Sequence, residues 1–409
     1  MSILRRLPTS RLIALSVLVV ALIGGGAAVA VAALSTSAGA PPPKPLAQAV
    51  HDGLAAPQVP GVTARIQFTN KLIDDASVEG GSALLKGATG RLWATKGHLR
   101  LELQSGSGDV QIVADDRTFS VYDASSNTVY KGTLPRKRTR GAKPDNGDRQ
   151  AHEIPTVAKI QDWLNHAMRD ANVSGAIPGT VAGQPTYTVR VGPKHDGGLL
   201  GAGELAWDAF RGLPLRAAIY AQGSDSPVLQ LTATDITYGP VPASDFAVGP
   251  PSGAKVVQVR QPSAGDARRG AAAKRRAHQT RHVHGLSAVQ GAVPFKLSAP
   301  DKLVGLPRRE VKLLDWGGKP AALVAYGENL GGVAVIERAT EQPRSAAGGR
   351  GGERRRGEVR LPTISIDGAS GTELATALGT VVSFERGGVS YTVLGSVPPA
   401  AAEAAARGL

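Results

Sequence analysis

The chain of 409 residues contains no cysteine, and aromatic side chains make up only 4% of it. Without cysteine there can be no disulfide, no thiolate metal site and no lipid-modified N-terminal cysteine. Any folded part must therefore be stabilised by burial of apolar side chains, for which a hydrophobic content of 42% is sufficient. A chain of this length predicts two domains.

Long apolar runs are also absent, with one exception at the N-terminus. Residues Leu12–Leu34 are almost all Leu, Ile, Val, Ala or Gly, and Ser16 is the only polar residue among them. At about 1.5 Å per residue, this run is long enough to cross a hydrocarbon core of about 30 Å. It therefore predicts one transmembrane helix over residues 12–34.

The charges on either side of this run predict its orientation. Arg5, Arg6 and Arg11 precede it, and no Lys or Arg follows before Lys44. Because positive charge stays on the cytoplasmic side, residues 1–11 are expected in the cytoplasm and the bulk of the chain outside the cell membrane. The alternative is a signal peptide cleaved near the small residues 38–40, which would give a secreted protein.

Basic residues outnumber acidic ones and give a formal net charge of +14, but they are clustered. The clusters at 136–143, 268–281 and 344–360 lie in polar or Gly-, Ala- and Pro-rich stretches without apolar periodicity, which is typical of loops and linkers. The alternative is attraction to anionic lipid headgroups or wall polymers. Nucleic acid is not an expected partner, because no aromatic side chains are interleaved for base stacking.

No sequence motif of catalysis is present. There is no G-x-S-x-G motif and no P-loop, and the paired carboxylates Asp74-Asp75 and Asp115-Asp116 lie in predicted turns. His278, His282 and His284 have no nearby carboxylate or cysteine to complete a metal site. We therefore expect neither an enzyme nor a cofactor nor a metal.

Residues 46–259 alternate between apolar and polar side chains in short runs, which is typical of half-buried β-strands. Val62–Thr69 and Leu99–Gln104 are two clear examples, and turns with Asp, Ser and Asn separate the runs that follow. Short connections predict an antiparallel meander. A Pro-rich spacer at 35–45 and a short helix from Leu46 to Leu54 precede it.

One amphipathic helix interrupts the strands. Val157, Ile160, Leu164 and Met168 recur at steps of three and four residues after Pro155. A helix with one apolar face, inserted into an antiparallel sheet, is expected to pack across the concave side of that sheet. The predicted fold class is thus mainly β: an open antiparallel β-barrel with an α-helical lid.

Three groups of motifs in this region resemble the LolA-type lipoprotein carriers and their RseB-type regulatory relatives. They are, in order, Gly90-Arg91-Leu92-Trp93 with Gly97-His98-Leu99-Arg100-Leu101-Glu102 and Tyr122-Asp123; Trp207-Asp208 with Gly212-Leu213-Pro214-Leu215-Arg216; and Tyr238-Gly239-Pro240-Val241-Pro242 with Phe246, Pro250-Pro251 and Gly253-Ala254. The resemblance covers about half of the chain. It implies an unclosed barrel around an apolar cavity that accepts acyl chains. Because this chain carries a predicted anchor and a second domain, a stationary sensor or acceptor is favoured over a soluble shuttle.

The candidate ligand-binding residues are apolar side chains on the predicted strands and helix, together with three tryptophans that could close a cavity mouth. They are Ile66, Phe68, Leu84, Trp93, Leu99, Leu101, Val113, Phe119, Trp163, Leu164 and Trp207. Each of them would equally well be an ordinary core residue. Arg100 and Arg216 are candidates for contact with an anionic headgroup at the rim, or are solvent-facing strand residues.

Residues 286–409 are predicted to form a small α+β domain after a basic linker at 260–285. Hairpins are expected at Gly317-Gly318 and Gly387-Gly388, and helices at Thr372–Leu378 and Ala400–Arg407. In outline this part is similar to small extracytoplasmic domains attached to anti-sigma factors and related sensors.

Two hypotheses of function follow. The first is a membrane-anchored extracytoplasmic protein that binds a lipid or a lipoprotein acyl chain in the apolar cavity, as acceptor, carrier or sensor. The second is a regulatory interaction protein of the RseB type that contacts an anti-sigma factor or another envelope protein.

Overall fold

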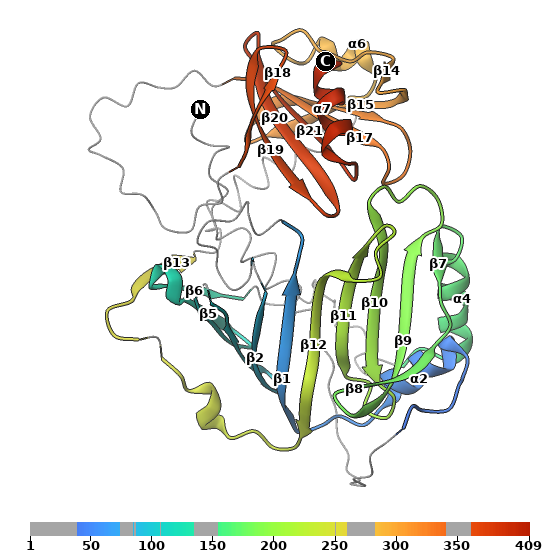
Figure 1. Cartoon of the computed structure of the whole chain (residues 1–409), viewed down its shortest axis with the longest axis vertical. Helices are drawn as coiled ribbons and strands as arrows, with labels where there is room; N and C mark the ends of the chain where they lie inside the picture. The colour runs from blue at the N-terminus through green and yellow to red at the C-terminus, as the bar shows by residue number, and fades with distance from the viewer. Residues whose placement is uncertain are drawn as a thin grey trace, which may run out of the picture.

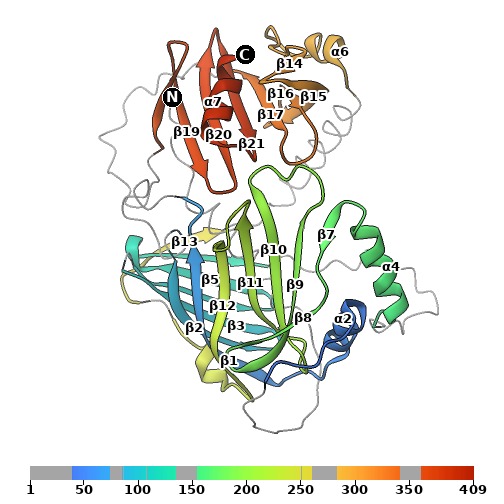
Figure 2. The same cartoon turned by 45° about the vertical axis from the view of Figure 1, so that its right-hand side comes forward.

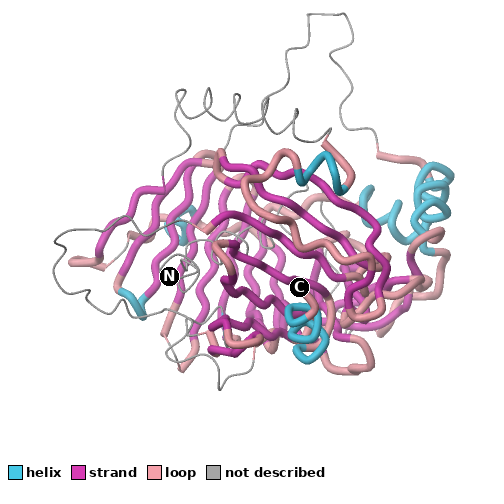
Figure 3. The backbone as a smooth tube through the Cα atoms, turned by 90° about the horizontal axis from the view of Figure 1, so that it is seen from above, coloured by secondary structure: helices cyan, strands magenta, loops and turns pink. Residues whose placement is uncertain are grey.

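The computed structural model describes residues 39–73, 85, 87–106, 108–134, 154–249, 251–259, 283–340 and 361–409. They form two β-sheets, of 13 and 8 strands, with a few short helices (Figure 1). The larger sheet is strongly curled, as the view from above shows (Figure 3). The chain is therefore mainly β, with a half-barrel in its first part.

The larger sheet uses strands from Gly61 to Val259. In chain order they are β1 (Gly61–Asn70), β2 (Ala88–Thr95), β3 (His98–Gln104), β4 (Val110–Asp115), β5 (Thr118–Asp123), β6 (Thr128–Thr133), β7 (Ala171–Val173), β8 (Ile177–Val181), β9 (Gln184–Pro193), β10 (Leu200–Asp208), β11 (Pro214–Ala221), β12 (Pro227–Tyr238) and β13 (Lys255–Val259). The predicted antiparallel meander is confirmed for β1–β6 and for β9–β12, and β1 pairs with β12 to join the two runs. The exception is β13, which pairs parallel with β6 at one edge of the sheet.

The alternation of the sequence determines the core of β1–β5. Val62, Ala64 and Ile66 of β1 lie on one face, and cross-strand pairing brings apolar residues of the next strands to that face. The buried cluster that results consists of Val62, Ala64, Ile66, Leu101, Leu103, Val110, Ile112 and Val121. Burial of each larger side chain contributes about 1.5–3 kcal/mol. Side chains from β12 and the β10–β11 turn, such as Leu231 and Leu213, also pack against this cluster.

The predicted helices are present as α2 (Leu46–Ala55) and α4 (Val157–Ala167). However, α4 does not lie across the concave face of the sheet, where the lid was predicted. Helix α4 packs against α2 and the edge strand β7 rather than across the concave face, and Ile160 is its only buried residue. Helix α2 instead covers part of the sheet: its Ala49 packs with Tyr187 of β9 and Trp207 of β10. The helical cover is therefore short and lies at one flank (Figure 2).

The predicted spacer is not a free linker in its described part. Pro41 is buried, and the Tyr187 hydroxyl donates a hydrogen bond of 2.6 Å to the carbonyl of Pro42. The Lys44 ammonium lies 2.7 Å from the Asp52 carboxylate on α2. The segment 41–45 is therefore held to β9 through the Pro42 carbonyl and to α2 through Lys44.

The second sheet comprises β14 (Lys302–Leu303), β15 (Leu306–Trp316), β16 (Lys319–Tyr326), β17 (Val333–Ala339), β18 (Thr363–Ile366), β19 (Ala369–Thr376), β20 (Gly379–Arg386) and β21 (Val389–Gly395), with α6 (Leu286–Gln290) and α7 (Pro399–Arg407). Both predicted Gly-Gly hairpins and the C-terminal helix are confirmed. The helix predicted over Thr372–Leu378 is wrong: these residues belong mostly to β19, which pairs with β18 and β20. Pairing on both sides overrides the weak local helical pattern.

The two sheets touch through their loops. The amide of Leu199, between β9 and β10, donates to the Ser396 carbonyl at 3.0 Å, and the amide of Ala377 donates to the Leu72 carbonyl at 2.8 Å. A Cβ on Gly198 would lie 2.1 Å from the Ser396 carbonyl oxygen, so only glycine allows this approach.

Within the described residues, every helix is too short or too polar to span a bilayer. The run Leu12–Leu34, the three basic clusters and most of the predicted linker lie outside those residues.

Candidate functional site

The larger sheet carries an open cavity of about 680 Å³ beside β4, β5 and β6, which we call the strand-end pocket. Its apolar wall is made by Val113, Ala114, Phe119, Phe246, Val248 and Val259, and its polar lining includes His98, Asp115, Thr118 and Lys131. The size falls within the range of pockets that hold small ligands. A second hollow of about 470 Å³ lies on β1–β3 and is lined mainly by charged and polar side chains such as Arg65, Arg91 and Glu102.

The floor of the strand-end pocket depends on a glycine. Phe119 of β5 pairs with Gly132 of β6. A Cβ on Gly132 would lie 2.6 Å from the Phe119 ring, so the ring can lie across β6 only because Gly132 has no side chain. The missing side chain thus makes room for the Phe119 ring on the face of the sheet that carries the buried core.

The segment after β12 closes one side of the pocket. It contains a short 3₁₀ helix, η3 (Ala243–Phe246), and returns to the sheet at β13. The Phe246 ring packs on His98 of β3, with ring centroids 5.4 Å apart. Arg100 donates a hydrogen bond of 2.7 Å to the carbonyl of Asp245. These two contacts hold Phe246 and Val248 over the sheet.

Arg100 is itself fixed by its neighbours. Its guanidinium lies over the Trp93 ring, 4.6 Å from the centroid, and donates to the Glu102 carboxylate. Burial acts to raise the pKa of Glu102, but hydrogen bonds from Arg100 and Gln111 outweigh it and the pKa lies below its ordinary value. Arg100 therefore clamps η3 to β3 and is not presented to a ligand headgroup as predicted.

The polar side of the pocket carries the Asp115 carboxylate, the Lys131 ammonium and the His98 ring. Asp115 accepts hydrogen bonds from the Thr118 hydroxyl and from the amides of Arg117 and Thr118, and these lower the pKa of its carboxyl. Its carboxylate is thus committed to the turn that the sequence predicted. Lys131 and His98 line the pocket as the groups that could face an anion.

The strand register separates the predicted apolar site residues. Ile66, Leu101 and Phe68 pack in or against the core on the inner face, and the strand register places Leu99 on the same face. Trp93 and Val113 project from the opposite face, because each is paired with Arg100. Of the predicted residues, Val113 and Phe119 line the strand-end pocket, and Leu84 lies outside the described residues.

The remaining predicted residues lie on the other half of the sheet. Trp207 is buried beneath α2 with Tyr187, while Trp163 and Leu164 sit on α4, with Trp163 exposed. The Nε of Arg216 lies 2.9 Å from Oε1 of Glu204 without the alignment of a hydrogen bond, so the contact is an ion pair. Neither tryptophan nor Arg216 borders the pocket.

No local pattern singled out five further residues of the lining, which are His98, Lys131, Phe246, Val248 and Val259. They come from β3, β6, η3 with the segment after it, and β13, and the return of the chain from β12 to β6 brings them together. Phe246 is part of a quoted motif, but as the close of a domain rather than as a pocket wall.

No protein-family model matches the chain, and no curated protein matches it. Among solved structures, the chain is similar to the Pseudomonas aeruginosa MucA/MucB complex, with 17% identity over 88% of this chain and 94% of that chain and a TM-score of 0.37. It is also similar to a putative outer membrane lipoprotein-sorting protein domain from Vibrio parahaemolyticus (10% identity, 49% and 95% covered, TM-score 0.21). A LolA superfamily protein from Nitrosomonas europaea matches at 10% identity, 50% and 98% coverage and a TM-score of 0.21.

These similar structures are of the kinds that the sequence motifs resemble, LolA-like and RseB-like. At such identities and TM-scores the likeness concerns the type of fold alone.

Proposed function

We propose that the chain is a membrane-anchored, extracytoplasmic binding protein that takes an acyl chain of a lipid or lipoprotein into the strand-end pocket. The observation that supports this is the apolar lining by Val113, Phe246 and Val248 around about 680 Å³. The proposed binding place differs from the predicted one: the ligand enters at the ends of β4–β6 and not beneath a helical lid.

The physical demands of acyl binding fit this pocket. Each buried CH₂ contributes about 0.8 kcal/mol, so eight of them supply about 6 kcal/mol without any directed polar contact. Lys131 and His98 border the apolar wall and can receive an anionic headgroup or carboxylate. The open mouth allows the chain to enter and leave without rearrangement of the sheet.

The test is photolabelling of the full chain in phospholipid nanodiscs with a diazirine-bearing fatty acid. Labels are expected on peptides that contain Phe119 or Val248. Val248→Asp places a charge in the apolar wall and should abolish this labelling, because burial of an unpaired charge is strongly unfavourable. Ala247→Asp, one residue away, exposed and not in the lining, is the matched control and should label like the parent chain. Equal labelling of both variants would refute the proposal.

A second candidate is regulatory binding of an envelope protein such as an anti-sigma factor. The observation that favours it is the edge strand β13, which ends the strand order of the larger sheet and exposes Val256 and Val259. Within the described chain the outer edge of β13 pairs with no strand, so an extended partner segment could add to it. A cross-linker on Val256→Cys that captures a membrane regulator, together with an unlabelled pocket, would favour this function over acyl binding.

A further inference from the structure

Four large apolar side chains are exposed on α2, on α4 with the residues just before it, and on the β10–β11 turn, and we call them the α2–α4 rim. They are Phe210 in the β10–β11 turn (61% exposed), Leu54 at the end of α2 (55%), Trp163 on α4 (53%) and Ile154 just before α4 (42%). Exposed aromatic and aliphatic side chains that gather in one place mark an interaction surface more often than isolated ones do.

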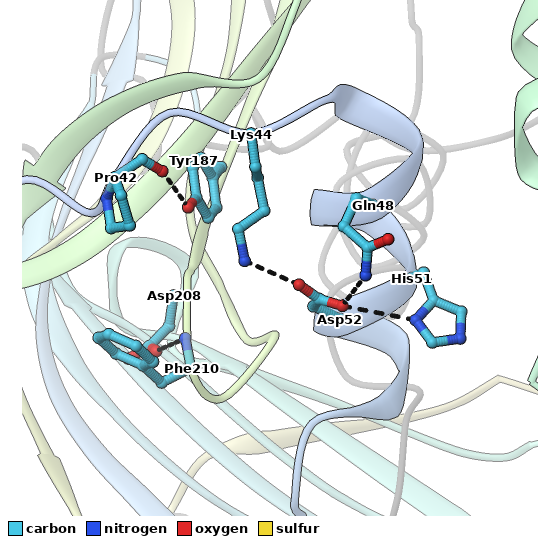
Figure 4. A network of polar contacts seen from close by, with 8 residues as sticks. All are labelled: Pro42, Lys44, Gln48, His51, Asp52, Tyr187, Asp208 and Phe210. Carbon is cyan, nitrogen blue, oxygen red and sulfur yellow. Dashed lines mark hydrogen bonds and ion pairs between the residues drawn. The ribbon is translucent and has the colours of Figure 1, made fainter. Parts of the chain in front are cut away.

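The β10–β11 turn, which carries the most exposed side chain of the rim, is held by hydrogen bonds. The buried Asp208 carboxylate accepts hydrogen bonds of 2.8 Å from the amides of Phe210 and Arg211 and one of 2.7 Å from the Tyr238 hydroxyl. These bonds fix the β10–β11 turn that carries Phe210, and Figure 4 shows the one between Asp208 and Phe210.

The elements of the rim are neighbours. Gly53 of α2 contacts Gly212 of the turn so closely that a Cβ on Gly212 would lie 1.9 Å from the Gly53 carbonyl oxygen. Helix α4 packs on α2, as both cartoon views show (Figures 1 and 2). Helix α2 and the β10–β11 turn contribute Ala49 and Ala209 to the small buried cluster that also contains Tyr187 and Trp207.

The N-terminal segment reaches the sheet at this same cluster. The Tyr187 hydroxyl bonds the Pro42 carbonyl, so the chain is held beside α2 from there on (Figure 4). Between Leu34, the last residue of the apolar run, and Gly39, a fully extended chain spans at most about 18 Å. If Leu12–Leu34 crosses the bilayer, the end of the sheet that bears the rim lies next to the lipid headgroups.

The opposite end of the larger sheet contacts the second sheet. The loop before β10 meets Ser396 of the second sheet, whereas the Phe210 turn follows β10 at its other end. At about 3.3 Å per residue, the nine residues of β10 separate the two ends by roughly 30 Å. The second sheet therefore lies away from the rim (Figure 1).

We propose that the α2–α4 rim inserts into the headgroup region of the bilayer that holds the anchor, so that the half-barrel rests on the membrane and the second sheet points away from it. This inference depends on the anchor of the proposed function. Its chemistry is that of interfacial segments: aromatic and aliphatic side chains with a nearby cation, here Lys159 at 5.7 Å from the centroid of the Trp163 ring.

The test uses the absence of native cysteine. Single variants Phe210→Cys and Leu54→Cys of the full chain carry a bimane fluorophore in nanodiscs of phosphatidylethanolamine and phosphatidylglycerol, with nitroxide-labelled lipid as quencher. Trp316→Cys is the control, because Trp316 is 49% exposed but lies on the second sheet. Quenching at the two rim positions should be at least about twofold that at the control, since interfacial side chains reach only about 5–10 Å into the bilayer.

The outcomes separate the inference from its premise. A chain that enters the discs but shows equal quenching at all three positions would overturn the rim contact and leave the anchor standing. A chain that does not co-purify with the discs would overturn the anchor and the rim contact together. Acyl labelling of the strand-end pocket is independent of both results, because that pocket shares no residue with the rim.

Discussion

The stability of the second sheet should depend on pH through one buried carboxyl group. Glu337 of β17 is fully buried. Its Oε2 accepts a hydrogen bond of 2.9 Å from the amide of Ser298, while Oε1 is buried without a hydrogen-bond partner. Burial raises the pKa of Glu337 to about 7, and the bond from Ser298 offsets this only in part.

The sign and size follow from this value. Below about pH 4.5 the carboxyl group is protonated in both the folded and the unfolded chain and has no effect. Between about pH 4.5 and 7 the unfolded chain loses the proton while the folded chain keeps it, so the free energy of unfolding falls as pH rises. A difference of about 2.5 pKa units at about 1.36 kcal/mol each gives a loss of about 3 kcal/mol, complete above pH 7.

The perturbation is Glu337→Gln, which keeps the shape and cannot ionise. Hydrogen exchange of the β17 amides, corrected for the intrinsic pH dependence, reports the free energy of opening. At pH 8 the free energy of opening should be up to about 3 kcal/mol higher in the variant than in the parent chain. Near pH 4.5 the two values should agree. Glu328→Gln is the control, because Glu328 is exposed and forms an ion pair with Arg309 at the surface.

One result would refute this reasoning. If the parent chain and Glu337→Gln show the same dependence of opening free energy on pH, the carboxyl group is ionised in the folded state or lies in contact with water. A variant that is less stable at every pH would show instead that the amide of Gln does not replace the carboxyl group as the partner of Ser298.

Two further predictions concern the devices that shape the larger sheet. Gly212→Ala should release α2, because Gly212 has a φ of +65° and the new Cβ would meet the Gly53 carbonyl. We therefore expect faster proteolysis in α2. Gly223→Ala, also at positive φ but in open space, is the control and should leave α2 protected. Arg100→Ala should free η3 from β3 by removing the bond to the Asp245 carbonyl, which costs about 1.5–3 kcal/mol locally. Limited proteolysis between residues 243 and 249 would detect the release, and unchanged protection would contradict the assigned clamp.

Strand formation in this chain is readable from the sequence because alternation is a local property. The pattern Val62–Thr69 predicted β1, and Leu99–Gln104 predicted β3, within a residue or two of their bounds. Turn residues such as Asp115 act through bonds to their own neighbours, so their role was also predictable. By contrast, Thr372–Leu378 has a weak local preference, and pairing with β18 and β20 decided its state.

The candidate site was predictable only in part, because it depends on contacts between distant segments. Val113 and Phe119 were selected as apolar strand residues, but a strand pattern does not say which face meets a pocket. Phe246 reaches His98 only after the chain has passed through nine further strands, β4–β12, and wrapped back along the sheet. The place of α4 beside α2, rather than over the sheet, likewise has no local signal.

The amino-acid sequence alone determined that this chain has no disulfide, carries one long apolar run and builds an antiparallel meander with few helices. These properties follow from composition and from the two-residue period of a strand, which need no knowledge of distant contacts. Only the tertiary structure decided which hollow stays open, which residues line it and which end of the sheet bears the apolar rim. Those features arise where the parallel strand β13, η3 and the N-terminal segment return to the sheet, and such long-range docking is set by packing rather than by local pattern.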